Sequence, residues 1–144
     1  MSSADSRRLL CGCLLLLLLG AAPAAAQQVP MKVTVVRISP EPGRTDPRAK
    51  RLDRILKGQL AYESLAVIDS QKRSVAVDDV WKVKLPGTGP LRVRPIDVGP
   101  NGALLSLDWE GELQGDFRVR RGTPLILGGP RSGNGKLIVV IDTR

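Results

Sequence analysis

Alternation of apolar and polar positions dominates the second half of the chain. Residues 80–85, 91–98, 103–110 and 113–121 are predicted strands in which apolar side chains recur at alternate positions and mostly charged or polar residues lie between them. This period is typical of strands with one face in a core and the other in solvent. Segments rich in glycine and proline separate the runs, so we expect antiparallel strands joined by turns.

Shorter runs of β-branched and other apolar residues predict further strands at 32–38, 65–69, 74–77, 125–127 and 136–142. Polar or glycine-rich segments between them predict turns at 70–73, 128–130 and 132–135. The last run, residues 136–142, shows no alternation. It is therefore expected to be covered on both faces.

One segment has the pattern of a helix. Asp46 can cap a helix whose first turn contains Pro47, a position where the missing N–H costs nothing. An apolar stripe at helical spacing follows and is formed by Leu52, Ile55, Leu56 and Leu60. These features predict one amphipathic helix near residues 47–60.

The predicted fold class is mainly β: a small antiparallel sandwich or partly open barrel with this single helix packed on it. The side chains expected to be largely buried are Leu52, Ile55, Leu56, Leu60, Trp81, Val83, Leu107, Trp109, Phe117, Val119, Ile138 and Val140.

The N-terminus has the three parts of an export signal. Arg7 and Arg8 precede an apolar stretch at 9–22, and Ala24-Ala25-Ala26 offers small side chains for cleavage before Gln27. We therefore interpret residues 1–26 as a cleavable signal peptide and residues 27–144 as a single β-rich domain. Retention of the segment as an anchor is the alternative. The expected location is the bacterial periplasm or the extracellular medium.

The amino-acid composition excludes several kinds of catalytic and metal-binding site. The chain has no histidine, and its two cysteines, Cys11 and Cys13, lie in the predicted signal. The remaining domain therefore lacks Ser-His-Asp and Cys-His catalysis, His- or Cys-ligated metal sites and disulfides. The carboxylates of Asp78 and Asp79 are sequence neighbours that would point to opposite faces of a strand. We predict no enzyme activity, no metal and no cofactor.

Residues 129–136 resemble a phosphate-binding P-loop because several glycines precede Lys136. The motif places four residues between its glycines, whereas five lie between Gly129 and Gly135. It also needs a Ser or Thr after the lysine, whereas Leu137 follows Lys136. The next segment is also predicted to be a strand, not the helix whose N-terminus would bind phosphate. A hairpin loop is the favoured interpretation.

The charge balance suggests a binding surface. Removing Asp5, Arg7 and Arg8 leaves 20 basic and 13 acidic residues, a net charge of +7. The candidate anion-binding residues lie on the predicted helix, and they are Arg48, Lys50, Arg51, Arg54 and Lys57. Such a face attracts anionic lipid or acidic polysaccharide, although a solvated helix face has the same pattern. With only 3% aromatic residues, no base-stacking platform and hence no nucleic-acid partner is expected.

Charged rows are also predicted on the outer sheet face. Asp108 and Glu110 lie on a strand between the strands that carry Arg92 and Arg118, so a meander would interleave the signs.

The order of signal, Val-rich strand, Asp46-Pro47 helix and β-meander resembles small exported bacterial β-rich proteins of unassigned function. The closing segments, residues 122–130 and 136–141, are similar to the β-rich end of secretin-type outer-membrane channel subunits. The first resemblance implies an exported β domain, and neither resemblance supplies functional residues.

Two functions follow from the sequence. The leading one is a non-catalytic structural or adaptor protein of the bacterial cell envelope that contacts an envelope protein partner through a sheet edge or the helix. The alternative is an anion-binding module that uses the basic helix. The sequence leaves the oligomeric state open.

Overall fold

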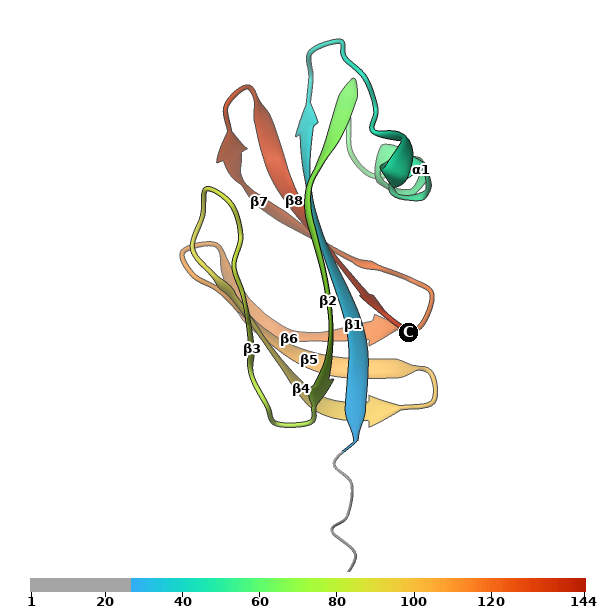
Figure 1. Ribbon diagram of the computed structural model, residues 1–144, viewed down its shortest axis with the longest axis vertical. Helices are drawn as coiled ribbons and strands as arrows, with labels where there is room; N and C mark the ends of the chain where they lie inside the picture. Colours follow the sequence, from blue (N-terminus) through green and yellow to red (C-terminus); the bar gives the residue numbers. More distant parts are fainter. Residues whose placement is uncertain (1–26) are drawn as a thin grey trace, which may run out of the picture.

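Two four-stranded antiparallel sheets form the protein in the computed structural model, which describes residues 27–144 (Figure 1). The elements in chain order are β1 (Gln28–Ser39), the 3-10 helix η1 (Pro47–Ala49), α1 (Lys50–Lys57), β2 (Ser64–Ala76), β3 (Trp81–Val83), β4 (Leu91–Gly99), β5 (Gly102–Trp109), β6 (Leu113–Arg120), β7 (Leu125–Ser132) and β8 (Gly135–Thr143). Sheet A has the order β2-β1-β8-β7 and sheet B the order β3-β4-β5-β6. The predicted mainly β fold with one short helix is confirmed, and within the described residues the sheets form a sandwich, not a closed barrel.

The main core lies between the two sheets. Alternate residues of β1 and β8 point toward sheet B, where they meet the inward row of β3, β4 and β5. Trp109 at the end of β5 is among the largest side chains of this core and is almost completely buried. The period-2 alternation read from the sequence of sheet B therefore corresponds to one buried and one exposed face.

A second core lies on the opposite face of sheet A. There α1 packs against Val36 of β1 and Ile138 and Val140 of β8, and Leu56 of α1 is 0% exposed (Figure 1). Strand β8 thus contributes to both cores, with Leu137, Val139 and Ile141 in the first. The expectation that residues 136–142 are covered on both faces is confirmed.

Eight of the twelve side chains expected in the core are buried. The other four, Leu52, Ile55, Leu60 and Phe117, are half-buried. Leu52 and Leu60 each line a surface pocket beside the helix, and Phe117 lies on β6, an edge strand. A single short helix cannot enclose its whole apolar stripe.

The predicted turn at 70–73 is wrong, because β2 continues through these residues without interruption. Strand β2 is an edge strand that pairs with β1 over its whole length, so its polar middle remains in register while facing solvent. A bulge opposite Val35 and Val36 leaves Ile68 unpaired. The chain turns after β2, where Asp78 adopts a φ of 71°.

The predicted turn at 128–130 is also wrong, because β7 extends to Ser132 and carries a bulge between Gly128 and Arg131. The hairpin turn lies at Gly133, whose φ is 59°, within the turn predicted at 132–135, which is confirmed. Residues 129–136 therefore belong to a β7–β8 hairpin, as favoured over a P-loop. Gly129 has a packing role: a Cβ there would overlap the Trp109 ring, 2.9 Å from Cζ2, and would lie 3.0 Å from the Leu137 carbonyl oxygen.

This packing predicts the effect of adding one methyl group. We expect Gly129→Ala to lower the free energy of unfolding by about 1–3 kcal/mol, since the added carbon overpacks the core against Trp109 and the backbone. Denaturant unfolding monitored by tryptophan fluorescence measures the change.

Gly99→Ala is the matched control, because a Cβ at Gly99 meets nothing within 4 Å. It should change the stability by less than about 0.5 kcal/mol. If Trp109 causes the loss, the penalty of Gly129→Ala will shrink in a Trp109→Leu background. An unchanged penalty would contradict the packing role.

Candidate anion-binding site

The segment entering the helix is fixed by Asp46. Its Oδ1 accepts a hydrogen bond from the backbone N of Arg48 at 2.9 Å, and Pro47 occupies the first helical turn. The predicted cap is confirmed. The Arg48 guanidinium folds back onto the same carboxylate, with Nη2 2.8 Å from Oδ2 and Nε 3.1 Å from Oδ1. These hydrogen bonds from Arg48 lower the pKa of Asp46 to about 2.

A second set of contacts ties down the other end of the helix. The Tyr62 hydroxyl donates to Asp53 Oδ1 at 2.6 Å, and Lys57 Nζ lies 3.6 Å from Asp53 Oδ2. The same ammonium group lies 5.9 Å from the centre of the Tyr62 ring, within the range of a cation–π contact. Burial, followed by the interaction with Asp53, raises the pKa of Tyr62. Lys57 therefore has local partners that satisfy its charge.

Two of the five predicted anion-binding residues line a common pocket. Arg48 and Arg51 line a pocket between the helix and sheet A. Lys50 and Arg54 are exposed and make no side-chain hydrogen bond or ion pair with the described residues. Lys57 faces Asp53 and Tyr62 at the other end of α1. Lys50, Arg54 and Lys57 are spaced along one face of α1, so only Arg48 and Arg51 of the five belong to the pocket.

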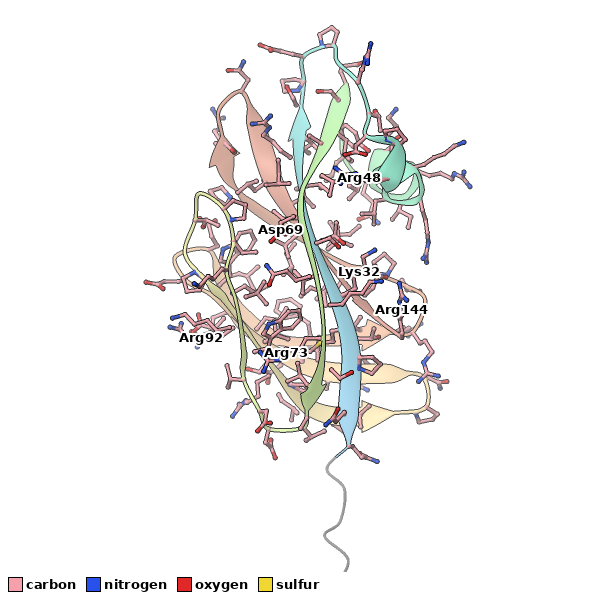
Figure 2. The ribbon with its side chains drawn as sticks, in the orientation of Figure 1. Lys32, Arg48, Asp69, Arg73, Arg92 and Arg144 are labelled. Atoms are coloured by element: carbon pink, nitrogen blue, oxygen red, sulfur yellow. The ribbon has the colours of Figure 1, made fainter. Side chains whose placement is uncertain are left out.

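That pocket, which we call the basic pocket, has a volume of about 330 Å³ and lies below α1 on the outer face of sheet A. Figure 2 shows Arg48 at the helix and Lys32 below it on β1. The lining residues come from both helical segments and three strands, and they are Lys32, Thr34, Arg48, Arg51, Leu52, Val67, Ser70 and Asp142.

Strand register explains how these groups meet. Lys32 pairs across the sheet with Lys72 of β2 on one side and Asp142 of β8 on the other. Thr34 is opposite Ser70, which places two hydroxyl groups in the next row. Among the described residues, Lys32 and Asp142 form no ion pair within 4.0 Å.

The electrostatics of the basic pocket favour an anion. Three cations and one carboxylate line it, although Arg48 already binds Asp46. The Arg51 guanidinium is held loosely, with Nη2 3.5 Å from the Gly122 carbonyl oxygen. Lys32 and Arg51 can therefore contribute charge-assisted hydrogen bonds to a carboxylate or phosphate, and the hydroxyls of Thr34 and Ser70 can add neutral ones.

Sequence reasoning missed Lys32, Thr34 and Ser70. The signal for Lys32 and Thr34 was present, because they alternate with Val33 and Val35 and must therefore face away from the main core. Ser70 was assigned to a turn that does not form. Its position depends on pairing with β1, which the sequence of β2 does not encode by itself.

The outer face of sheet B carries the expected mixture of charges. Strand β5 lies between β4 and β6, and Arg92 Nη1 is 3.6 Å from Asp108 Oδ2. The register limits the cancellation, because Arg118 is opposite Leu104 and not an acidic residue. The signs therefore alternate near Arg92 and less so near Arg118.

Comparisons with protein-family models, curated proteins and solved structures give no match. Among residues 27–144, no group of three or more His, Cys, Asp or Glu side chains is arranged to hold a metal ion. In the same part of the chain, no helix has the length and apolar character needed to cross a membrane. The predicted signal, residues 1–26, lies outside the described residues.

The Asp46–Arg48 pair predicts a response to acid. The folded-state pKa of Asp46, about 2, lies below the ordinary value of 3.8. The stabilising contribution of the pair is therefore present above pH 4 and is lost as the pH falls through about 2. An NMR titration of the carboxyl group should give this low midpoint, and Arg48→Gln should raise it toward the ordinary value.

Two variants isolate this effect. Asp46→Asn keeps a capping side chain but cannot titrate, so its melting temperature should fall less than that of the wild type between pH 4 and pH 2. Arg54→Gln removes a helix cation that does not touch Asp46 and should leave the pKa unchanged. Equal acid sensitivity of the Asn variant and the wild type would contradict the assignment.

Proposed function

We propose that this protein is a non-catalytic binding protein of the bacterial cell envelope, periplasmic or secreted, and that its basic pocket holds a negatively charged group of another envelope component. The supporting observation is the convergence of Lys32, Arg48 and Arg51 on one concave site that also contains the hydroxyls of Thr34 and Ser70. A site with several cations and few acids concentrates anions from solution.

The ligand chemistry is a carboxylate or phosphate group, which an acidic polysaccharide or an anionic lipid headgroup supplies. A concave site between helix and sheet accepts a group that projects from its carrier. Flat contact with a membrane would instead use the exposed Lys50 and Arg54. The two ligand sources and the two surfaces are therefore separable by experiment.

A second candidate function is the structural or adaptor protein expected from the sequence. The observation that favours it is the edge strand β7, which pairs with β8 on one side and has no strand on the other among the described residues. Its first residues, Leu125 and Ile126, are apolar and half-buried. Such an edge can pair with a strand from a partner protein.

The basic pocket predicts salt-sensitive binding. Wild-type protein should bind a soluble acidic polysaccharide or vesicles of anionic lipid at low salt. Binding should weaken strongly as the Debye length falls from about 10 Å at 0.1 M to about 3 Å at 1 M. Lys32→Gln combined with Arg51→Gln should weaken low-salt binding by about tenfold, because two charge-assisted hydrogen bonds are lost. Co-sedimentation with vesicles and calorimetry with the polysaccharide separate the two ligand sources.

The matched control is Arg94→Gln with Arg118→Gln, which removes the same charge from the outer face of sheet B. It should retain nearly wild-type affinity, and the melting temperatures should confirm that both variants are folded. Equal losses in the two double variants would indicate a nonspecific charge effect and overturn the pocket. A larger loss in Lys50→Gln with Arg54→Gln would place binding on the exposed helix face instead.

The adaptor function predicts a protein neighbour at the β7 edge. Residues 27–144 contain no cysteine, so Ile126→Cys introduces a unique cross-linking site. In the native envelope it should capture one stoichiometric protein, while Asp116→Cys on the β6 edge should not. Absence of any cross-link at 126, or equal capture at 116, would reject β7 as an interface.

A further inference from the structure

A second pocket lies at the opposite end of the helix from the basic pocket. It has a volume of about 590 Å³ and is bounded by the end of β1, the segment that follows α1 and the β7–β8 hairpin. In Figure 1 these segments occupy the end of sheet A beside α1, away from sheet B. We call it the hairpin pocket, and the residues used below are Ile38, Leu60, Tyr62, Arg131 and Lys136.

The floor of the hairpin pocket is apolar. Ile38 and Tyr62 are 7% and 8% exposed and belong to the second core, against which the half-buried Leu60 packs. The Tyr62 hydroxyl is already engaged with Asp53. The floor therefore offers apolar contact to a ligand.

Two cations border this floor. Arg131 and Lys136 are directly opposite each other in the β7–β8 pairing, and both line the pocket. Like charges at facing positions of adjacent strands destabilise a sheet. Neither residue forms an ion pair with any described residue.

Two other facing cation pairs each have an acidic residue opposite one member on the next strand. In the first, Lys32 faces Lys72 on one side and Asp142 on the other. In the second, Arg92 faces Lys82 on one side and Asp108 on the other. At the corresponding place beside Lys136 the next strand carries Ile38.

The lining of the hairpin pocket contains no acidic residue either. The nearby Glu41 accepts a hydrogen bond from the Asn134 amide at 3.0 Å. Of the three facing cation pairs, Arg131–Lys136 is thus the one with no acidic residue opposite it on the next strand, and it borders an apolar concavity whose lining has no acidic residue.

We propose that the hairpin pocket binds an amphipathic anion, with its hydrocarbon part on Ile38, Leu60 and Tyr62 and its anionic head between Arg131 and Lys136. The head supplies the negative charge that the sheet lacks at this position. The volume of the pocket lies within the range of about 300–1,000 Å³ found for small-molecule sites. This site is independent of the basic pocket.

Calorimetry with dodecanoate below its micelle concentration tests the proposal. Dodecanoate should bind and should raise the melting temperature, because a ligand of the folded state stabilises it. Acetate has the head without the chain, and dodecyltrimethylammonium has the chain with the opposite charge, so neither should bind comparably. No dodecanoate binding, or equal binding of both long-chain compounds, would overturn the proposal.

Variants locate the site. Arg131→Gln with Lys136→Gln should weaken dodecanoate binding by about tenfold or more, and without ligand it should melt no lower than the wild type because a like-charge pair is removed. Lys32→Gln with Arg51→Gln should bind dodecanoate normally, which separates this site from the basic pocket. If the Arg131/Lys136 variant binds like the wild type, or the Lys32/Arg51 variant loses binding, the assignment is wrong.

The source of the head group is resolved by a third ligand. A single-chain phospholipid with an anionic headgroup presents the same chain with a phosphate. Stronger binding than dodecanoate, lost in the same Arg131/Lys136 variant, identifies a lipid as the source, whereas weaker binding identifies a free carboxylate. Retention of this lipid by the Arg131/Lys136 variant would contradict the proposed head-group position.

Discussion

The need to cover sheet A on both faces governs this structure. Strand β8 places Leu137, Val139 and Ile141 toward sheet B, and Ile138 and Val140 toward the helix. Burial of one such side chain stabilises the folded state by roughly 1.5–3 kcal/mol. Sheet B covers the first row. Without α1 the second row would face water, so the helix is required for stability even though it contributes only one fully buried leucine.

The size of the helix then determines where the pockets lie. With eight residues, α1 is about 12 Å long, whereas the twelve residues of β1 extend over about 40 Å. The helix therefore covers only part of the outer face, around Val36, Ile138 and Val140. The basic pocket lies beside it toward Lys32 and Thr34, and the hairpin pocket lies toward the β7–β8 hairpin. Both follow from placing a short helix on a long sheet.

Local patterns were sufficient to predict most elements. Asp46-Pro47 identified the start of the helix, alternation identified the strands of sheet B, and the unbroken apolar run of β8 indicated burial on two faces. These features depend on side chains that are close in the sequence. The middle of β2 could not be recognised, because its polar residues remain extended only through hydrogen bonds to β1.

The candidate sites were harder to predict than the fold for the same reason. Lys32 and Ser70 approach each other through the β1–β2 register, and Arg131 meets Lys136 only because β7 continues past Gly128. The role of Gly129 depends on Trp109, which is twenty positions earlier in the chain. A single sequence records which residues are available, whereas register decides which of them share a pocket.

The position of β1 joins the two ends of the described residues in one sheet. Strand β1 begins at Gln28, and the Gln27 carbonyl already accepts a hydrogen bond from Val77 at 2.9 Å. Only one residue, Gln27, therefore lies between the predicted cleavage site and the start of β1. Strand β1 also pairs with β8, which ends at Thr143. The complete sheet A therefore needs strands from both ends of residues 27–144, and such non-local pairing slows folding.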